Sequence, residues 1–409
     1  MARQPLMPVD EALSRITRAF SPLPPETVAL DAALGRVLAE DVTARLTQPP
    51  VAVSAMDGYA VRAADVAKVP VDLRVLGEAP AGRAFAGEVV AGTAVRIFTG
   101  GPVPRGANAI VIQEDTERAG DRVTVREGAS VGRYIRPAGL DFNRGDVGLR
   151  AGTLLGAREI ALAAAMNVPW VAVRRRPRVG LLATGDEIVR PGEPVGANQI
   201  VSSNALGLAA LIRSRGGVPI DLGIAPDHRA TLSAMADGAK GLDLLLTMGG
   251  ASVGDHDLVQ AALGDRGLSV DFWRIAMRPG KPLIFGAIGE TKLLGLPGNP
   301  VSSLVCGLVF VAAALRAMLG LAGPPVATET VELGVPLPAN DVRQDYLRSS
   351  LIVGPKGQLQ AVPFDRQDSS MLSLLARADC LVIRPALAPP AKAGDPVSMI
   401  RLSVTGGPL

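Results

Sequence analysis

Apolar and polar positions repeat along the chain with two different periods, and the change between them divides it into regions. Between residues 177 and 323, short apolar runs such as RVGLLAT and LDLLLT alternate with stretches such as SSNALGLAALIRSRGG, where apolar residues recur three and four positions apart. The short runs predict strands buried on both faces, and the longer stretches predict helices. This alternation predicts a doubly wound, mostly parallel α/β domain at 177–323.

Helical spacing dominates three segments that lie before this region. Apolar residues fall on one face at 8–20, 31–40 and 152–168. We expect the third helix to pack on the first two, which predicts an N-terminal helical domain that is discontinuous in sequence, 1–45 and 147–176.

Short alternating runs between glycines mark two further regions, 46–146 and 324–409. Period-2 alternation with glycine turns is typical of small β domains. The first of these domains would be inserted into the helical domain, and the second would end the chain. The predicted fold class is therefore multidomain α/β plus β.

Composition narrows the class of protein. An aromatic content of 3% argues against stacking platforms for single-stranded nucleic acid, and 42 basic residues against 39 acidic ones are too balanced for a nucleic-acid binder. Two cysteines and two histidines exclude a disulfide framework, a cysteine zinc site and a multi-histidine metal site. The N-terminus lacks an apolar signal core, and the longest charge-free stretch, 293–315, contains two prolines and suits a buried helix better than a membrane span. We therefore expect a cytoplasmic protein that binds neither nucleic acid nor membrane.

The stretch LDLLLTMGGASVGDHD, residues 242–257, is the strongest candidate for a ligand site. Three glycines follow its buried strand: Gly249, Gly250 and Gly254. They let the backbone take positive φ and approach a ligand closely. Asp255 and Asp257 stand where a helix begins, and a helix N-terminus after a glycine turn can hold an oxyanion. Two carboxylates beside an anion need a cation between them, so we expect Mg²⁺. A tight turn with two capping aspartates remains the alternative.

Other charged residues follow the neighbouring strands, whose carboxyl ends meet at one edge of a parallel sheet. The candidate metal ligands are Glu187, Asp227, Asp255 and Asp257. The candidate anion-binding cations are Arg274, Arg278 and Lys281. This combination suits a phosphate or another oxyanion together with a hard cation. No Walker lysine follows the glycine loop and no GxSxG or HExxH motif is present, which disfavours P-loop hydrolysis and those kinds of hydrolase. Each charged residue taken alone is equally typical of a solvated surface, and the spacing does not identify the ligand.

Seven motifs that follow one another along the chain narrow the prediction of function: ALGRVLAEDV, SAMDGYAV, AVRIFTG, TGDEIVRPG, GGASVGDHD, RPGKP and LPGNPVSS. In this order they resemble the molybdopterin molybdenumtransferase family, which includes bacterial MoeA and the E domain of gephyrin. The resemblance covers essentially the whole chain. It implies a cytoplasmic homodimer with four domains per subunit. It also implies that adenylylated molybdopterin and molybdate are converted to molybdenum cofactor and AMP with Mg²⁺.

The same motifs imply roles for individual residues. Asp57, which composition alone would assign to a turn, would reach into the partner subunit's cleft and act there with Glu187, Asp227 and Asp257. Molybdate would be held by Arg278, Lys281, Ser302, Arg348 and Ser369. The remaining substrate contacts would come from Thr99, Arg136, Asp141, Gly249, Gly250, Ser252, Gly254, Arg274, Pro297 and Pro300.

Several positions depart from the family pattern: Val51, Val53, Met248, Arg278, Asp368, Ser370 and Cys380. Arg278 replaces a lysine, which keeps the charge but changes its geometry. Asp368 bears most directly on the molybdate contact, because a carboxylate beside an anion site is unfavourable.

Two other functions stay open. One is a molybdopterin adenylyltransferase that uses ATP, since that reaction uses a related α/β domain. The other is a scaffold that binds cofactor or a partner peptide without turnover. The additional domains argue against the first, and the intact acidic set argues against the second. As protein partners we expect a molybdopterin adenylyltransferase and molybdenum enzymes that receive the cofactor.

Overall fold

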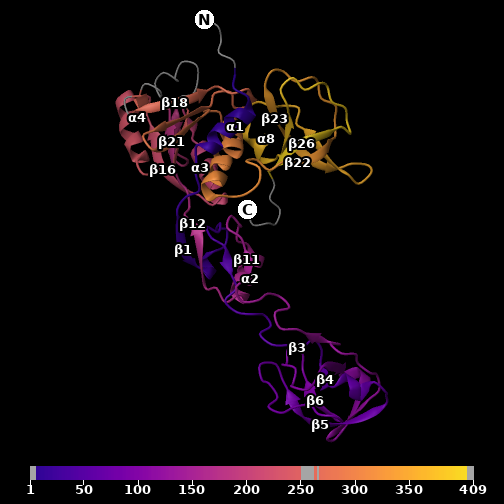
Figure 1. Cartoon of the computed structure of the whole chain (residues 1–409). Helices are drawn as coiled ribbons and strands as arrows, with labels where there is room; N and C mark the ends of the chain where they lie inside the picture. The colour runs from indigo at the N-terminus through magenta and orange to yellow at the C-terminus, as the bar shows by residue number, and fades with distance from the viewer. Residues whose placement is uncertain (1–5, 250–261, 265–266, 403–409) are drawn as a thin grey trace.

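The computed structural model describes residues 6–249, 262–264 and 267–402. The chain is elongated (Figure 1). The α/β domain and the C-terminal β domain lie together at one end, the inserted β domain lies at the other, and a narrow middle unit joins them. The predicted class, multidomain α/β plus β, is confirmed.

The α/β domain is built on a six-stranded sheet with the order β16-β13-β17-β21-β20-β18. The strands are β13 (Arg178–Thr184), β16 (Val218–Ala225), β17 (Leu244–Met248), β18 (Leu268–Trp273), β20 (Ile284–Ile288) and β21 (Thr291–Leu296). The first four in the spatial order are parallel, and only β20 is reversed, since it pairs antiparallel with both β21 and β18; the predicted mostly parallel sheet is confirmed. A short parallel pair, β14 (Ile188–Val189) and β15 (Ile200–Val201), extends from the loop after β13.

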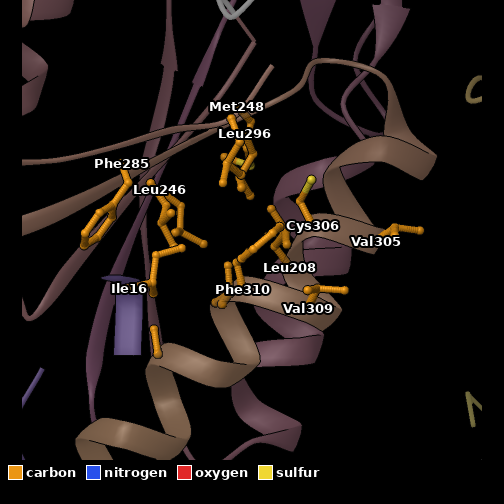
Figure 2. Close-up of a cluster of buried hydrophobic side chains, with 14 of the residues drawn as sticks. Ile16, Leu208, Leu246, Met248, Phe285, Leu296, Val305, Cys306, Val309 and Phe310 are labelled. Carbon is orange, nitrogen blue, oxygen red and sulfur yellow. The ribbon is translucent and has the colours of Figure 1, made fainter. Parts of the chain in front are cut away.

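Helices cover both faces of this sheet. They are α3 (Asn204–Ser214), α4 (Arg229–Ala236) with the 3₁₀ turn η4 (Asp237–Ala239), and the continuous α6 (Pro300–Cys306), π-helical η5 (Gly307–Val311) and α7 (Ala312–Leu319). Consecutive leucines of β17 enter different cores, Leu246 packing with α3, α6 and η5 (Figure 2) and Leu245 packing with α4. A strand buried on both faces needs a continuous apolar run, which is why the leucine run at 244–246 was informative.

Among the described residues, one helix is long and apolar enough to cross a membrane, Pro300–Leu319, with a mean hydropathy of 2.0. Of its 18-residue window, 78% is buried inside the protein. Val305, Val309 and Phe310 all belong to the buried core cluster (Figure 2). The prediction of a buried core helix here is confirmed.

The first helix, α1 (Val9–Arg18), does not pack where the sequence analysis expected. Its buried face, with Ala12 and Ile16, packs against η5 and α7 of the α/β domain rather than against residues 157–165. The apolar stripe was correctly placed, but helical spacing does not say which surface a helix covers.

The middle unit is mostly β structure. Its strand pairs are β1 (Pro25–Ala29) with β12 (Trp170–Arg174), and β2 (Val42–Thr43) with β11 (Val147–Leu149). Its one α-helix among the described residues is α2 (Ala157–Ala165), which packs on β11 and on the 3₁₀ turn η1 (Leu30–Ala32).

The predicted helix at 31–40 is wrong. The only helical turn described at 31–40, η1, ends at Ala32; Gly35 then has φ +70°, which an α-helix does not accommodate, and Leu34 is 59% exposed. Val37 and Leu38 are instead extended and form bridges to Leu154 and Val173. A positive φ at glycine breaks an α-helix more cheaply than at any other residue, so the apolar spacing was overridden by one backbone position.

The inserted β domain contains a six-stranded sheet with the order β7-β4-β6-β5-β9-β8. Its strands are β4 (Gly58–Val61), β5 (Val71–Ala79), β6 (Thr93–Ile97), β7 (Ala109–Ile112), β8 (Thr116–Ala119) and β9 (Arg122–Val125), with 3₁₀ turns η2 (Ala63–Val66) and η3 (Gln113–Asp115). A separate pair, β3 (Val53–Ser54) and β10 (Ile135–Arg136), lies where the chain enters and leaves this domain.

The C-terminal domain closes into a five-stranded barrel, because β23 pairs with both β24 and β25 while β22 joins β24 to β26 and β26 joins β25. Its elements are β22 (Glu329–Leu333), β23 (Gln344–Val353), β24 (Leu359–Pro363), β25 (Cys380–Arg384), β26 (Pro396–Arg401) and α8 (Leu372–Ala376). A strand of the preceding region, β19 (Met277–Arg278), adds to β23 from outside. Closure leaves the barrel few free edges, which stabilises a small β domain.

Candidate functional site

A cleft of about 510 Å³ lies at the carboxyl edge of the parallel strands. The sheet register places Ala183 beside Met248 and Met248 beside Leu296, so β13, β17 and β21 end level with one another. The loops that follow these strands therefore meet, as the sequence predicted. The cleft is lined by Ala183, Glu187, Ile188, Ile200, Ser202, Asn204, Met248, Gly249, Pro282, Pro297, Gly298, Asn299, Pro300, Ser302 and Ser370.

The loop after β13 carries the carboxylate of Glu187 into the cleft. Gly185 has φ +138°, and a Cβ there would collide with that carboxylate. The backbone conformation favours glycine here, and the absence of a side chain also leaves room for the Glu187 carboxylate. Asp227, on the loop after β16, is held next to this turn because its N–H donates to Asp186 Oδ1 at 3.0 Å. Glu187 and Asp227 therefore lie on neighbouring loops at the same sheet edge.

The loop after β17 begins with Gly249 at φ +99°, where a Cβ would lie 2.6 Å from the carbonyl oxygen of Thr184. Met248, a departure from the family pattern, is 2% exposed and closes the strand beneath the cleft. The rest of the predicted glycine loop, Gly250, Ser252, Gly254, Asp255 and Asp257, lies outside the described residues. Among the residues that are described, no group of three or more His, Cys, Asp or Glu side chains converges as a metal site.

The loop after β21 and the start of α6 form the floor. Pro297 and Pro300 line the cleft, and Ser302 is 5% exposed on the first turn of α6. Asn204 fixes this loop, since its Nδ2 donates to the carbonyl oxygen of Gly298 at 2.7 Å. Sequence analysis missed Asn204, because an asparagine at the start of a predicted helix is already explained as a cap.

The C-terminal barrel covers one side of the cleft through the loop at 367–371. The N–H of Val301 donates to the carbonyl oxygen of Ser369 at 3.1 Å, and Asn299 Nδ2 donates to Ser369 Oγ at 2.9 Å. Asp368 Oδ1 accepts from both the N–H and the hydroxyl of Ser370, at 2.8 and 2.7 Å. These bonds lower the pKa of Asp368, so its carboxylate stays ionised. The carboxylate stabilises the turn that places Ser370.

The predicted cations have different environments. Arg348 is 1% exposed and has no ion-pair partner among the described residues, with Nε donating to Gln367 Oε1 and Nη1 to the carbonyl oxygen of Met371. Arg278 is ion-paired to Asp345 and Asp341. Arg274 stacks over Trp273, with 3.6 Å from its Cζ to the ring centroid. Lys281 is exposed and, within the described part of the chain, has no ion-pair partner.

Asp57 and Thr99 meet in the inserted β domain. Asp57 Oδ1 accepts from the N–H of Thr99 at 2.7 Å and from its hydroxyl at 2.8 Å. The backbone bond contributes most and the hydroxyl next to holding the pKa of Asp57 below its ordinary value, with a further contribution from Arg96. Asp57 is therefore an ionised carboxylate at neutral pH, held in a fixed orientation by its partner.

Arg136 and Asp141 line a separate cavity of about 560 Å³ where the inserted β domain begins. Its walls are largely apolar and include Pro49, Val51 and Val53, with Gly100 adjoining Thr99. Two of the departures from the family pattern, Val51 and Val53, therefore line the same cavity as the charged pair.

These two groups of predicted residues lie far apart within one chain. Asp57 precedes β4 at one end of the molecule, whereas β21 and α3, which border the cleft, are at the other (Figure 1). One chain therefore does not bring Asp57 to Glu187.

Comparison with known families covers nearly the whole chain. Residues 7–167 match the MoeA N-terminal region (domain I and II), 180–317 match a probable molybdopterin binding domain, and 330–402 match the MoeA C-terminal region (domain IV).

Individual relatives agree with this. The chain is 33% identical over 389 residues to the molybdopterin molybdenumtransferase of Haemophilus influenzae, covering 92% of this chain and 94% of the relative. It is 41% identical over 324 residues to molybdopterin molybdenumtransferase 2 of Mycobacterium tuberculosis, covering 76% and 79%. Among solved structures, the molybdopterin biosynthesis MoeA protein of Pyrococcus horikoshii superposes with a TM-score of 0.84 at 29% identity, over 97% of this chain and 100% of that one.

Proposed function

The chain belongs to the molybdopterin molybdenumtransferase family, and we propose that it completes molybdenum cofactor by inserting molybdate into adenylylated molybdopterin with release of AMP. The observation that carries this proposal is the cleft at the carboxyl edge of the sheet. Its lining combines the carboxylate Glu187 and the hydroxyl residue Ser302 of the α/β domain with Ser370 of the C-terminal domain.

Molybdate is a tetrahedral dianion and needs converging cations and hydroxyl donors. Arg348 supplies a buried guanidinium that has no ion pair among the described residues and only a longer-range attraction to Asp368, so it can attract an oxyanion. Lys281 supplies an exposed ammonium, and Ser302 and Ser369 supply hydroxyls at the junction of α6 and the barrel. Arg348 and Lys281 draw the oxyanion in and the serine hydroxyls orient it.

A cation is needed to bring the adenylyl phosphate next to acidic side chains. Carboxylate oxygens are ligands that Mg²⁺ prefers, and Glu187 and Asp227 offer them on adjacent loops. With Asp255 and Asp257 they would hold Mg²⁺, which would neutralise charge on the phosphate when bound. Gly249 keeps the backbone open enough for the substrate to approach.

The active protein would be a homodimer. Asp57 and Thr99, with Arg136 and Asp141 beside them, lie far from the cleft of their own chain, so a second copy must supply them if they act there (Figure 1). The low pKa of Asp57 makes it an acceptor of hydrogen bonds or a ligand at neutral pH rather than a general acid.

The first test is AMP release from adenylylated molybdopterin by purified protein with Mg²⁺, with and without molybdate. We expect release only with molybdate, and a loss of about 100-fold or more in Asp57→Ala and in Glu187→Ala, as is typical when a charged active-site group is removed. Asp72→Ala is the matched control, since Asp72 is bonded by Thr124 in the same domain as Asp57 but is not a predicted site residue. Molybdate-independent transfer of AMP from ATP would instead indicate an adenylyltransferase. Tight binding without release would indicate a scaffold.

A further inference from the structure

The turn RPGK joins the α/β domain to the C-terminal barrel. Met277 and Arg278 form β19, which pairs in parallel with Gln344 and Asp345 at the start of β23. The N–H of Gln344 also donates to the carbonyl oxygen of Ala276 at 2.8 Å. The barrel is therefore attached to the α/β domain along this short strand, through the loop at 367–371, and through a shared apolar core in which α8 packs on α6.

The guanidinium of Arg278 makes hydrogen bonds across that attachment. Nε donates to Asp345 Oδ1 at 2.8 Å, and Nη2 donates to the other oxygen of the same carboxylate. Nη1 donates to Asp341 Oδ2 at 3.3 Å. Asp345 is 4% exposed, so this bidentate pair is covered on its acidic side. A planar fork bound to one carboxylate in this way fixes both distance and angle between the two domains.

The strand that carries Asp345 also carries Arg348. The two are three residues apart on β23, and Arg348 holds the loop at 367–371 through Gln367 and Met371. That loop places Ser369 against Asn299 and Val301 at the start of α6. Any rotation of the barrel about β19 would therefore move Arg348 and Ser369 together relative to Ser302.

We propose that Arg278 is a positioning residue that locks the barrel onto the α/β domain through Asp345, and that Lys281, three residues further on, is the cation of this turn that meets the oxyanion. This inference rests on the proposed function. It assigns the two cations of the RPGK motif different roles, domain attachment for Arg278 and anion binding for Lys281. Arg278 acts on molybdate only through the placement of Arg348 and Ser369. Its own charge is balanced by Asp345 and Asp341.

The two roles predict opposite effects when Asp345 loses its charge. If Arg278 is a lock, Asp345→Asn weakens molybdate binding about tenfold, or about 1.4 kcal/mol, as does Arg278→Gln. If Arg278 is a direct ligand, Asp345→Asn releases a cation and leaves binding unchanged or tighter. Binding is measured by equilibrium dialysis of molybdate and checked through the molybdate KM, with the KM for adenylylated molybdopterin expected to stay within about twofold.

A readout that needs no substrate separates this proposal from the proposed function. The exposed linker at 321–328 should be cut about tenfold faster by a broad-specificity protease in Asp345→Asn and Arg278→Gln, because the barrel detaches more often. In the double variant the effects should not add, since both changes break one contact. The charge-exchanged variant, Arg278→Asp with Asp345→Arg, should restore part of both the slow cleavage and the molybdate affinity.

Arg401→Gln is the matched control, because Arg401 pairs with Glu329 inside the barrel, away from the junction. It should change neither readout. If Asp345→Asn does not fold, Asp341→Asn and Arg278→Lys replace it, and both should weaken binding and speed cleavage by a smaller factor. Unchanged or tighter molybdate binding in Asp345→Asn, or full binding in Arg278→Lys with unchanged cleavage, would overturn the proposal.

Discussion

Single side chains in this protein gain their chemistry from one or two neighbours that the sequence does not place beside them. Asp57 by composition is a turn residue, and its resemblance to a family motif made it a candidate. The structure adds Thr99, 42 positions away, as the donor that orients it. Asp368 had raised doubt about the anion site. Its bonds to Ser370 give that carboxylate a task, which no sequence pattern indicated.

The pH dependence of activity should report the Asp57–Thr99 pair. The lowered pKa keeps Asp57 ionised above it, so activity that needs the carboxylate is lost only as pH falls through that low value. Thr99→Val removes the hydroxyl bond, so the acidic limb of kcat/KM should move to higher pH. Thr124→Val, which removes a similar hydroxyl bond to Asp72, should leave the limb in place. A limb that does not move in Thr99→Val would show that Asp57 is not the group that titrates.

At the scale of helices and strands, the sequence predicted correctly the features that depend on the local pattern of apolar residues. It did not predict features that depend on which distant segments pack together. The leucine run of β17 and the apolar stripe of α1 were both correct, because burial on two faces or on one leaves a distinct period. The segment at 31–40 failed because Gly35 takes a positive φ. The packing of α1 on α7 was not predicted, because an apolar stripe shows that a helix is buried but not which element covers it. The closed barrel could not be predicted, since strand order depends on pairings between distant segments.

Truncation of the buried strand should test the two-faced core. Leu246 is fully buried beside Phe310 and Leu208 (Figure 2), so Leu246→Ala should cost about 2–5 kcal/mol through lost contacts and a residual cavity. Leu206→Ala, at a position 62% exposed on α3, should cost less than about 0.5 kcal/mol. Denaturant unfolding of the α/β domain measures both. Equal effects would contradict the assigned core.

For the whole molecule, the elongated chain separates residues that the family resemblance brings together. The predicted boundaries at residues 46, 147, 177 and 324 stay predictions. In the middle unit, β1 pairs with β12 and β2 pairs with β11, so the chain segment that leads to the inserted β domain is bonded to the segment that returns from it. This double connection suits the middle unit to hold the inserted β domain away from the cleft of its own chain. The separation of Asp57 from Glu187 is thus a property of the molecule as a whole. It could not be read from any motif.

Molybdate-dependent AMP release from mixed variants tests most directly whether the active site is shared between two subunits. Asp57→Ala and Glu187→Ala proteins, each nearly inactive, are unfolded or dissociated together and reassembled at equal amounts. Random pairing makes about half of the dimers mixed, and each mixed dimer regains one intact site, so about a quarter of wild-type activity should return. Reassembly of Asp57→Ala with the Asp57→Ala, Glu187→Ala double variant should restore nothing. If the first mixture also stays inactive although mixed dimers form, the site is not shared between subunits and the central claim is contradicted.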